Sequence, residues 1–269
     1  MDWASVLKDQ LRERAQSWAR RPGVASYGSL GTPATVLFPR SVDGDSHGNF
    51  FPDAWSAIRS NPDWSCRLEK AHAQSAALPL EYQATAKELD SSNSSDALLM
   101  NCFCYPGSPS RLARALGASL DDAIPEFGYR ARILLSDGST DATEVDMLLG
   151  DTFVEAKLTE KDFTSKPKDQ VRRYSAFPDT FDVDLLPADE KHFHGYQLIR
   201  NVLAAAQHNR KLIVLLDARR PDLLEQWWQV HAAISAGELR ARCGVRFWQQ
   251  LAAASAPDHH NLLEQKYGV

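Results

Sequence analysis

Three charged residues stand in the otherwise apolar, strand-like segment TEVDMLLGDTFVEAKL, which spans residues 143–158. They are Asp146, Glu155 and Lys157. Charged side chains are costly inside buried strands unless another charge compensates them. A divalent cation held by the two carboxylates is one possible compensation. A strand face open to water is the alternative.

The dipeptide Gly150-Asp151, between the two apolar runs, is a favourable two-residue β-hairpin loop. A hairpin with this turn places Asp146 directly opposite Glu155. Because side chains alternate along a strand, Lys157 shares their face. Directly opposed side chains lie about 5 Å apart, and like charges there destabilise the pair. The spacing therefore predicts either a metal site or a solvated face, and does not by itself decide between them.

The surrounding sequence predicts the elements that position this hairpin. The expected elements are helices over 94–105 and 108–117, strands over 127–135, 143–149 and 152–158, a helix over 195–207, a strand over 211–217, and helices over 221–234 and 245–254. This order predicts an α/β domain with a mixed sheet flanked by helices. In the helix over 195–207 the polar residues Arg200 and Asn201 lie beside an apolar packing side, and ordinary solvent exposure would also account for them.

We expect residues 1–90 to form an N-terminal helical and irregular extension packed on the core, and residues 91–269 to form the domain that carries the hairpin. An amphipathic helix is expected over 2–20, and helical sequence resumes at 65–78 and 81–90. Between them, SVDGDSHGNFF holds Asp43, Asp45 and His47 at alternate positions. This segment lacks the Glu that closes an EF-hand loop, so an ordinary turn is favoured over a metal site.

The composition is that of a globular protein, with 43% hydrophobic residues in 269. No apolar stretch approaches the roughly 20 residues that span a membrane. The charged N-terminal segment lacks the apolar core of a signal peptide, and the spacing of the four cysteines matches neither a zinc ribbon nor a CxxC pair. We therefore expect a cytoplasmic protein with no membrane segment and no disulfides.

The net charge of −5 gives no general electrostatic reason to bind nucleic acid. A local basic strip, KLTEKDFTSKPKDQVRRY, nevertheless follows the hairpin directly. Such a strip can contact phosphates. A solvated loop of mixed charge is the alternative.

The arrangement of Asp146, eight residues, and then Glu155-Ala156-Lys157 resembles the signature of the PD-(D/E)XK nuclease superfamily, which has the restriction-endonuclease-like fold. The order of the expected elements is similar to the α-β-β-β-α-β core of that family. The resemblance covers roughly residues 90–235 and leaves the N-terminal third unexplained. Val145 stands where the name of the motif has proline.

The resemblance implies a metal-dependent nuclease that hydrolyses phosphodiester bonds, with DNA as the expected substrate. Its role would be in restriction, defence or repair. It implies that Asp146, Glu155 and the carbonyl of Ala156 hold Mg²⁺ or Mn²⁺. Lys157 would orient the attacking water and stabilise the developing negative charge.

The family also implies supporting residues around this centre. A glutamine on the helix after the third strand often supports the site, and here it would be Gln197, with Gln170 as its rival. A further acidic ligand is expected at Glu126, with Glu88 as the second candidate.

Two alternatives to a nuclease stay open. One is a non-catalytic nucleic-acid-binding or assembly protein that reuses the fold, although the presence of all three signature side chains favours an active enzyme. The second is a solvated hairpin on an unrelated α/β protein. DNA is the expected partner. Assembly as a homodimer or with a partner subunit stays open.

Overall fold

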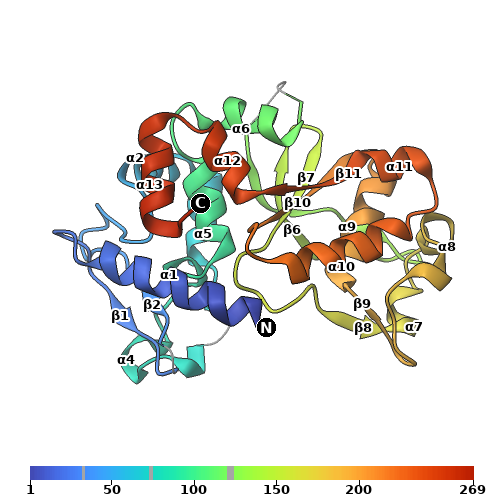
Figure 1. The fold of residues 1–269 in the computed structure, drawn as a ribbon, viewed down its shortest axis with the longest axis horizontal. Helices are drawn as coiled ribbons and strands as arrows, with labels where there is room; N and C mark the ends of the chain where they lie inside the picture. Colours follow the sequence, from blue (N-terminus) through green and yellow to red (C-terminus); the bar gives the residue numbers. More distant parts are fainter. Residues whose placement is uncertain (32–33, 73–74, 120–123) are drawn as a thin grey trace. The chain divides into compact units, whose positions relative to one another are not determined.

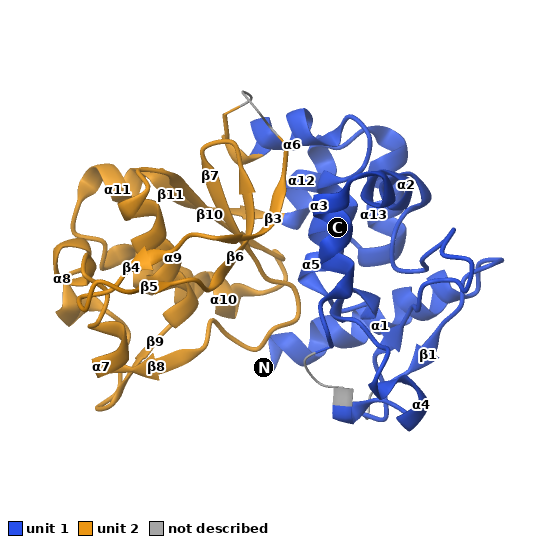
Figure 2. Cartoon of the chain, turned by 180° about the vertical axis from the view of Figure 1, so that it is seen from behind, with its two compact units in different colours: residues 1–115, 248–269 blue, residues 116–247 orange. Residues whose placement is uncertain are grey.

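The computed structural model describes residues 1–31, 34–72, 75–119 and 124–269, and it divides the chain into two compact units (Figures 1 and 2). Unit 1 consists of residues 1–115 and 248–269, and unit 2 consists of residues 116–247. This division differs from the predicted boundary at residue 90. The difference arises because the C-terminal residues pack with the N-terminal segment, a long-range contact that local sequence patterns do not report.

Unit 2 is built on a five-stranded mixed sheet with the strand order β11-β10-β7-β6-β3. The strands are β3 (Glu126–Arg130), β6 (Glu144–Leu149), β7 (Thr152–Ala156), β10 (Lys211–Leu216) and β11 (Cys243–Phe247). The pairs β3–β6 and β6–β7 are antiparallel, whereas β10 pairs in parallel with β7 and with β11. A parallel step needs a crossover connection, and helix α9 (Tyr196–Gln207) lies on the one between β7 and β10. The predicted mixed sheet flanked by helices is confirmed.

The rest of unit 2 consists of short ribbons and helices. They are β4 (Ile133–Leu134), β5 (Thr140–Asp141), β8 (Ser165–Pro167), α7 (Lys168–Val171), α8 (Phe177–Thr180), the 3₁₀ turn η4 (Val183–Leu185), β9 (His192–His194), α10 (Pro221–Ala232) and α11 (Gly237–Arg242). Strand β4 pairs with β5, and β8 pairs with β9. These ribbons lie outside the main sheet.

Helices α9 and α10 cover one face of the main sheet. Their apolar side chains form one buried cluster with Leu148, Phe153, Leu212, Val214 and Leu216 of the sheet. Gly195 precedes α9 with a φ of 70°, a conformation that favours glycine. A Cβ there would also lie 3.1 Å from the Val230 side chain of α10, so a glycine lets the two helices pack closely.

Four predicted elements are wrong in part. In the described part of the helix expected over 65–78, only the 3₁₀ turns Cys66–Glu69 and Ser75–Ala77 follow the end of α3 at Ser65. The strand over 127–135 breaks after Arg130, because Arg132 takes a left-handed φ of 50° before β4 begins. The helix over 245–254 starts only at Trp248, because the preceding residues pair with the free edge of β10 as strand β11. The helix over 81–90 is reduced to one α-helical turn and a 3₁₀ turn.

Unit 1 is mainly helical. Its elements are α1 (Trp3–Ala19), β1 (Tyr27–Gly28), β2 (Val36–Leu37), α2 (Pro52–Ser60), α3 (Pro62–Ser65), η1 (Cys66–Glu69), η2 (Ser75–Ala77), α4 (Leu80–Gln83), η3 (Glu88–Asp90), α5 (Ser95–Phe103), α6 (Ser108–Leu116, whose last residue belongs to unit 2), α12 (Trp248–Ala254) and α13 (Pro257–Tyr267). No helix in the described part of the chain has the length and apolar character needed to cross a membrane.

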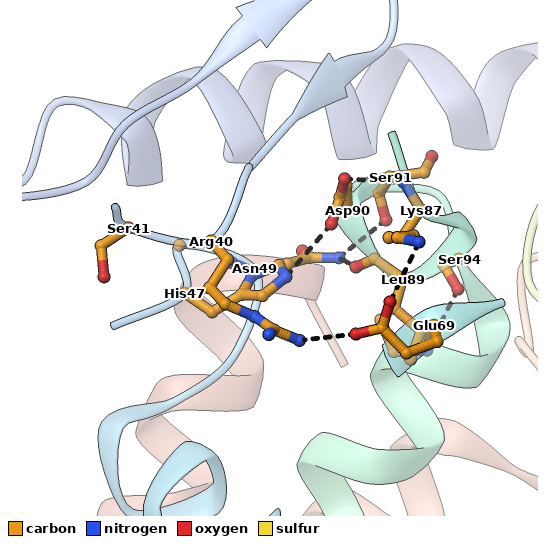
Figure 3. Close-up of polar contacts among 12 residues, drawn as sticks. Arg40, Ser41, His47, Asn49, Glu69, Lys87, Leu89, Asp90, Ser91 and Ser94 are labelled. Atoms are coloured by element: carbon orange, nitrogen blue, oxygen red, sulfur yellow. Dashed lines mark hydrogen bonds and ion pairs between the residues drawn. The ribbon is translucent and has the colours of Figure 1, made fainter. Parts of the chain in front are cut away.

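Buried amides hold the segments of unit 1 together. Asn101 of α5 is fully buried, accepts from the Phe51 amide at 2.8 Å and donates to the Tyr267 hydroxyl of α13 at 3.0 Å. Asn49 donates to the carbonyls of Leu89 and Ser91 (Figure 3). The C-terminal helix is therefore an integral part of this unit.

Candidate active site

The β6–β7 hairpin has the predicted register. Its pairs are Leu149–Thr152, Leu148–Phe153 and Met147–Val154, around the Gly150-Asp151 turn. Gly150 has a φ of 55°, as a two-residue hairpin turn of this kind requires. The turn residues therefore set the alignment that brings Asp146 toward Glu155.

Beyond the last of these pairs, the Asp146 side chain takes the place of a backbone carbonyl of β6 as hydrogen-bond acceptor. In a continued ladder the Ala156 amide would donate to the Val145 carbonyl. It donates instead to Oδ2 of Asp146 at 2.7 Å. On the other edge of β7, the Lys157 amide donates to the Leu215 carbonyl at 2.9 Å. Because donors alternate between the edges of a strand, the Ala156 carbonyl points toward β6, the side where Asp146 lies.

Glu155 is the most deeply buried carboxylate of the hairpin, with 1% of its surface exposed. Its Oε2 accepts a hydrogen bond from Nδ2 of Asn201 at 2.6 Å. Its Oε1 lies 3.0 Å from Nζ of Lys157. Among the described residues, Oε1 accepts no hydrogen bond of good geometry. A buried carboxylate with one incompletely satisfied oxygen is costly, so this oxygen is a candidate metal ligand.

Lys157 is 6% exposed and lies among several carboxylates. Burial by itself lowers the pKa of its ammonium group, but the negative charges of Glu155, Glu160 and Asp146 outweigh burial and raise the pKa above the ordinary 10.5. The side chain therefore carries its charge at neutral pH. A solvated hairpin face, the alternative left open by the spacing, does not describe these two buried residues, Glu155 and Lys157.

A hydrogen-bonded chain on α9 fixes Glu155. Arg200 donates from Nε and Nη2 to Oδ1 of Asn201, at 3.1 and 2.9 Å. Arg200 Nη2 also donates to the Glu144 carbonyl at the start of β6, at 2.8 Å. Arg200 is 3% exposed and Asn201 is fully buried, so simple solvent exposure does not account for this polar face of α9. Their role as supports was missed, because periodicity defines helix faces without showing what each face meets.

The segment after Lys157 is also tied down. The Arg220 side chain is fully buried, donates to the carbonyls of Leu158 and Lys161 at 3.2 Å each, and pairs with Asp222 at 2.8 Å. Glu160 accepts from the Leu158 amide at 2.7 Å. No sequence pattern singled out Glu160 or Arg220 as part of the site.

The remaining predicted residues lie elsewhere. Gln197 is half-buried in the first turn of α9, where its backbone amide donates to the Phe163 carbonyl at 3.0 Å, and Gln170 is exposed on α7. Glu126 is exposed at the start of β3, where it pairs with Leu148. Glu88 belongs to unit 1 and forms an ion pair with Lys70 at 3.0 Å.

The oxygen donors near the end of the hairpin fit a hard divalent cation. Asp146 and Glu155 supply carboxylates, and the Ala156 carbonyl points to the same side of β7. Within the residues that the structure describes, no group of three or more His, Cys, Asp or Glu side chains is arranged to hold a metal. Two carboxylates suit Mg²⁺, which usually keeps several waters and takes further oxygens from a substrate phosphate.

The alternate Asp43, Asp45 and His47 do not converge on one point. Asp43 accepts from the Ser41 hydroxyl at 2.6 Å, and Asp45 pairs with Arg59 at 2.9 Å. His47 contacts Asp90 at 3.2 Å (Figure 3). Each side chain thus satisfies a local partner, as expected for a turn.

Asn201 should stabilise both the fold and the site through Glu155. Replacing Asn201 by Leu keeps the size of the side chain but leaves a buried carboxylate oxygen without its donor, so the free energy of unfolding should fall by about 3 kcal/mol. Urea denaturation measures this loss.

The matched control is Gln197→Leu, one helical turn away on the same face. Its unfolding free energy should change by less than about 0.5 kcal/mol. Equal stability losses in the two variants would contradict the assigned role of Asn201.

Comparison with known proteins adds one finding. Residues 12–268 match the model of a protein family described as "Restriction Endonuclease associating with ARP". No curated protein and no solved structure matches the chain. The match agrees with the restriction-endonuclease-like fold of the mixed sheet, and it also covers the N-terminal third that the short motif left unexplained.

Proposed function

Because the chain belongs to the family of restriction endonucleases associating with ARP, we propose that it is a metal-dependent nuclease that hydrolyses phosphodiester bonds in DNA. The observation that best supports the proposal is the buried Glu155–Lys157 pair next to Asp146, at the point where the hairpin ladder ends. Burying such charges costs free energy. Ionisable groups whose pKa is perturbed by burial and by neighbouring charges concentrate at functional sites.

Each residue of the site has a proposed task. Asp146, Glu155 and the Ala156 carbonyl would hold Mg²⁺ or Mn²⁺. Such a cation, when bound, polarises a phosphodiester and lowers the pKa of a water molecule. The charged Lys157 orients the attacking water and offsets the negative charge that develops on the phosphate. Asn201 keeps the Glu155 carboxylate in place.

Two further predicted residues, Gln197 and Glu126, would support the site in this proposal. Gln197 lies one turn before Asn201 on the same face of α9, where it would position the lysine or the water. Glu126 would add an acidic group from β3. In the β3–β6 register the residue opposite Asp146 is Gly128, so no side chain from β3 covers Asp146 at that point.

We also propose that the chain works with a partner. The description of the family names an association with ARP. The net charge of −5 gives no general electrostatic attraction to DNA, so a partner that delivers the substrate would compensate. Exposed cations after the hairpin, among them Lys161, Lys166 and Arg172, would contact the phosphate backbone locally.

The proposal predicts cleavage that depends on a divalent cation. The chain, alone and with its partner, is incubated with single-stranded, duplex and branched DNA and with RNA, in Mg²⁺, in Mn²⁺ or in excess EDTA. We expect cutting of DNA in either metal and none in EDTA. Binding of DNA without cutting in any metal, even with the partner present, would instead identify a non-catalytic protein that reuses the fold.

A further inference from the structure

Unit 1 contains a cavity of about 720 Å³ that the proposed nuclease site does not use. Its walls come from the end of α1 and the following turn, from residues 45–50, and from α2. The volume lies within the range of about 300–1,000 Å³ that small-molecule sites occupy. The buried amides Asn49 and Asn101 hold the segment around residues 49–51, and a hydrogen bond from Trp18 ties α1 to Gly48 of the same segment.

Three largely buried aromatic side chains, Trp18, Phe50 and Trp55, line part of this cavity. Phe50 and Trp55 are stacked, with ring centroids 5.7 Å apart and planes 21° apart. Trp18 is fixed by a hydrogen bond from its indole N–H to the Gly48 carbonyl at 2.9 Å. The guanidinium group of Arg21 lies 3.5 Å from the centre of the Trp18 ring. These flat groups suit a planar aromatic ligand, because bases stack on aromatic rings and on arginine planes.

A second cavity of about 450 Å³ adjoins the first, since Trp55 and Arg59 line both. Arg40 also lines it and reaches Glu69 at 3.4 Å (Figure 3). Arg59 pairs with Asp45 at 2.9 Å. Both ion pairs are solvent-exposed and therefore weak, so a phosphate can replace the carboxylate partners at little cost. Arginine forks match phosphate oxygens in geometry and charge.

The wall between the two cavities has an unsatisfied donor. Trp55 is 3% exposed, and its indole N–H meets no acceptor among the described residues. A buried donor without a partner costs about 1–3 kcal/mol. The N–H is itself buried within the wall, so an acceptor on a bound molecule reaches it only if the wall opens.

We propose that these adjoining cavities bind a nucleoside phosphate. The base lies in the larger, aromatic cavity against Arg21 and Trp55, and the phosphate lies near Arg59 and Arg40. An uncharged apolar ligand would leave the arginines without a role, and a sugar alone would not use the flat aromatic walls. The nucleoside phosphate that binds here is either a free nucleotide or a nucleotide turned out of a DNA strand.

Binding is tested by calorimetry and by quenching of tryptophan fluorescence in the full chain, with AMP, GMP, CMP, dTMP, adenosine and inorganic phosphate as probes. We expect at least one mononucleotide to bind more tightly than adenosine or phosphate alone. Arg59→Ala should weaken that binding by about 10- to 100-fold, because a charge-assisted contact to the phosphate is lost. Arg21→Ala should weaken it as well.

The matched control is Arg12→Ala, which removes an arginine from α1 outside the cavity and should leave the affinity within twofold. A DNA oligonucleotide in EDTA separates the two sources. Binding of the oligonucleotide that needs Arg59, without binding of free nucleotides, would identify a turned-out nucleotide. Failure of every probe, or equal affinity in the Arg59 and Arg12 variants, would overturn the proposal. Asp146→Asn should bind the probes as the wild type does, so this result is independent of the proposed nuclease site.

Discussion

Replacing Asp146 by Asn should reduce metal-dependent DNA cleavage by about 1,000-fold or more while leaving the fold intact. The substitution removes the negative charge that would hold the cation. The Asn side-chain oxygen can still accept the hydrogen bond from the Ala156 amide, so the end of the hairpin ladder keeps its structure. Single-turnover cleavage in Mg²⁺ measures the loss, and circular dichroism confirms the fold.

The same hairpin offers a matched control at its turn. Asp151 accepts from the Ser119 amide at 2.9 Å and pairs with Lys211 at 3.0 Å. Asp151→Asn makes the identical chemical change outside the proposed site and should leave cleavage within about twofold. If Asp146→Asn cuts as fast as Asp151→Asn, Asp146 is not a ligand of the cation.

Replacing Lys157 by Met should lower both stability and activity. The variant leaves the buried Glu155 carboxylate without its cation, and removing one member of a buried pair costs about 3–5 kcal/mol. Cleavage should fall by about 100- to 1,000-fold, because the charge that offsets the developing negative charge is gone. Urea denaturation and single-turnover cleavage measure the two effects.

Mg²⁺ should stabilise Lys157→Met against thermal unfolding more than it stabilises the wild type. In the wild type the Lys157 ammonium already neutralises the carboxylates that would hold the metal, and the two cations repel each other. Lys211→Met is the control, because its partly exposed pair with Asp151 should contribute less than about 1 kcal/mol. Equal Mg²⁺ effects on all three proteins would contradict a metal site at Glu155.

The core of the site was predictable because it depends on local rules. A two-residue Gly150-Asp151 turn fixes the register as far as Met147–Val154, and alternation places Asp146 and Glu155 just beyond it. Spacing did not predict that the ladder ends there and that the Asp146 side chain accepts from the Ala156 amide. The long apolar run of β10 was equally clear as a buried strand. In both cases the informative residues lie within a few positions of one another.

The supports of the site were not predictable in the same way. Arg200 and Asn201 lie on a polar face of α9. This face meets Glu155 because the crossover connection from β7 to β10 lays α9 on the sheet, which local sequence does not report. Arg220 looks like a surface arginine in the sequence but lies buried against the carbonyls of Leu158 and Lys161. Strand β11 exists because β10 has a free edge to pair with, which is a tertiary effect that overrides local preference.

The division of the chain has a consequence for its synthesis. Helix α1 packs against α13, and the two helices stand at opposite ends of the sequence. The face of α1 that packs on α13 therefore lacks its partner while all of unit 2 is translated. Domains generally fold as units during translation, but here residues 1–115, which precede unit 2, complete their packing only after residues 248–269 have emerged.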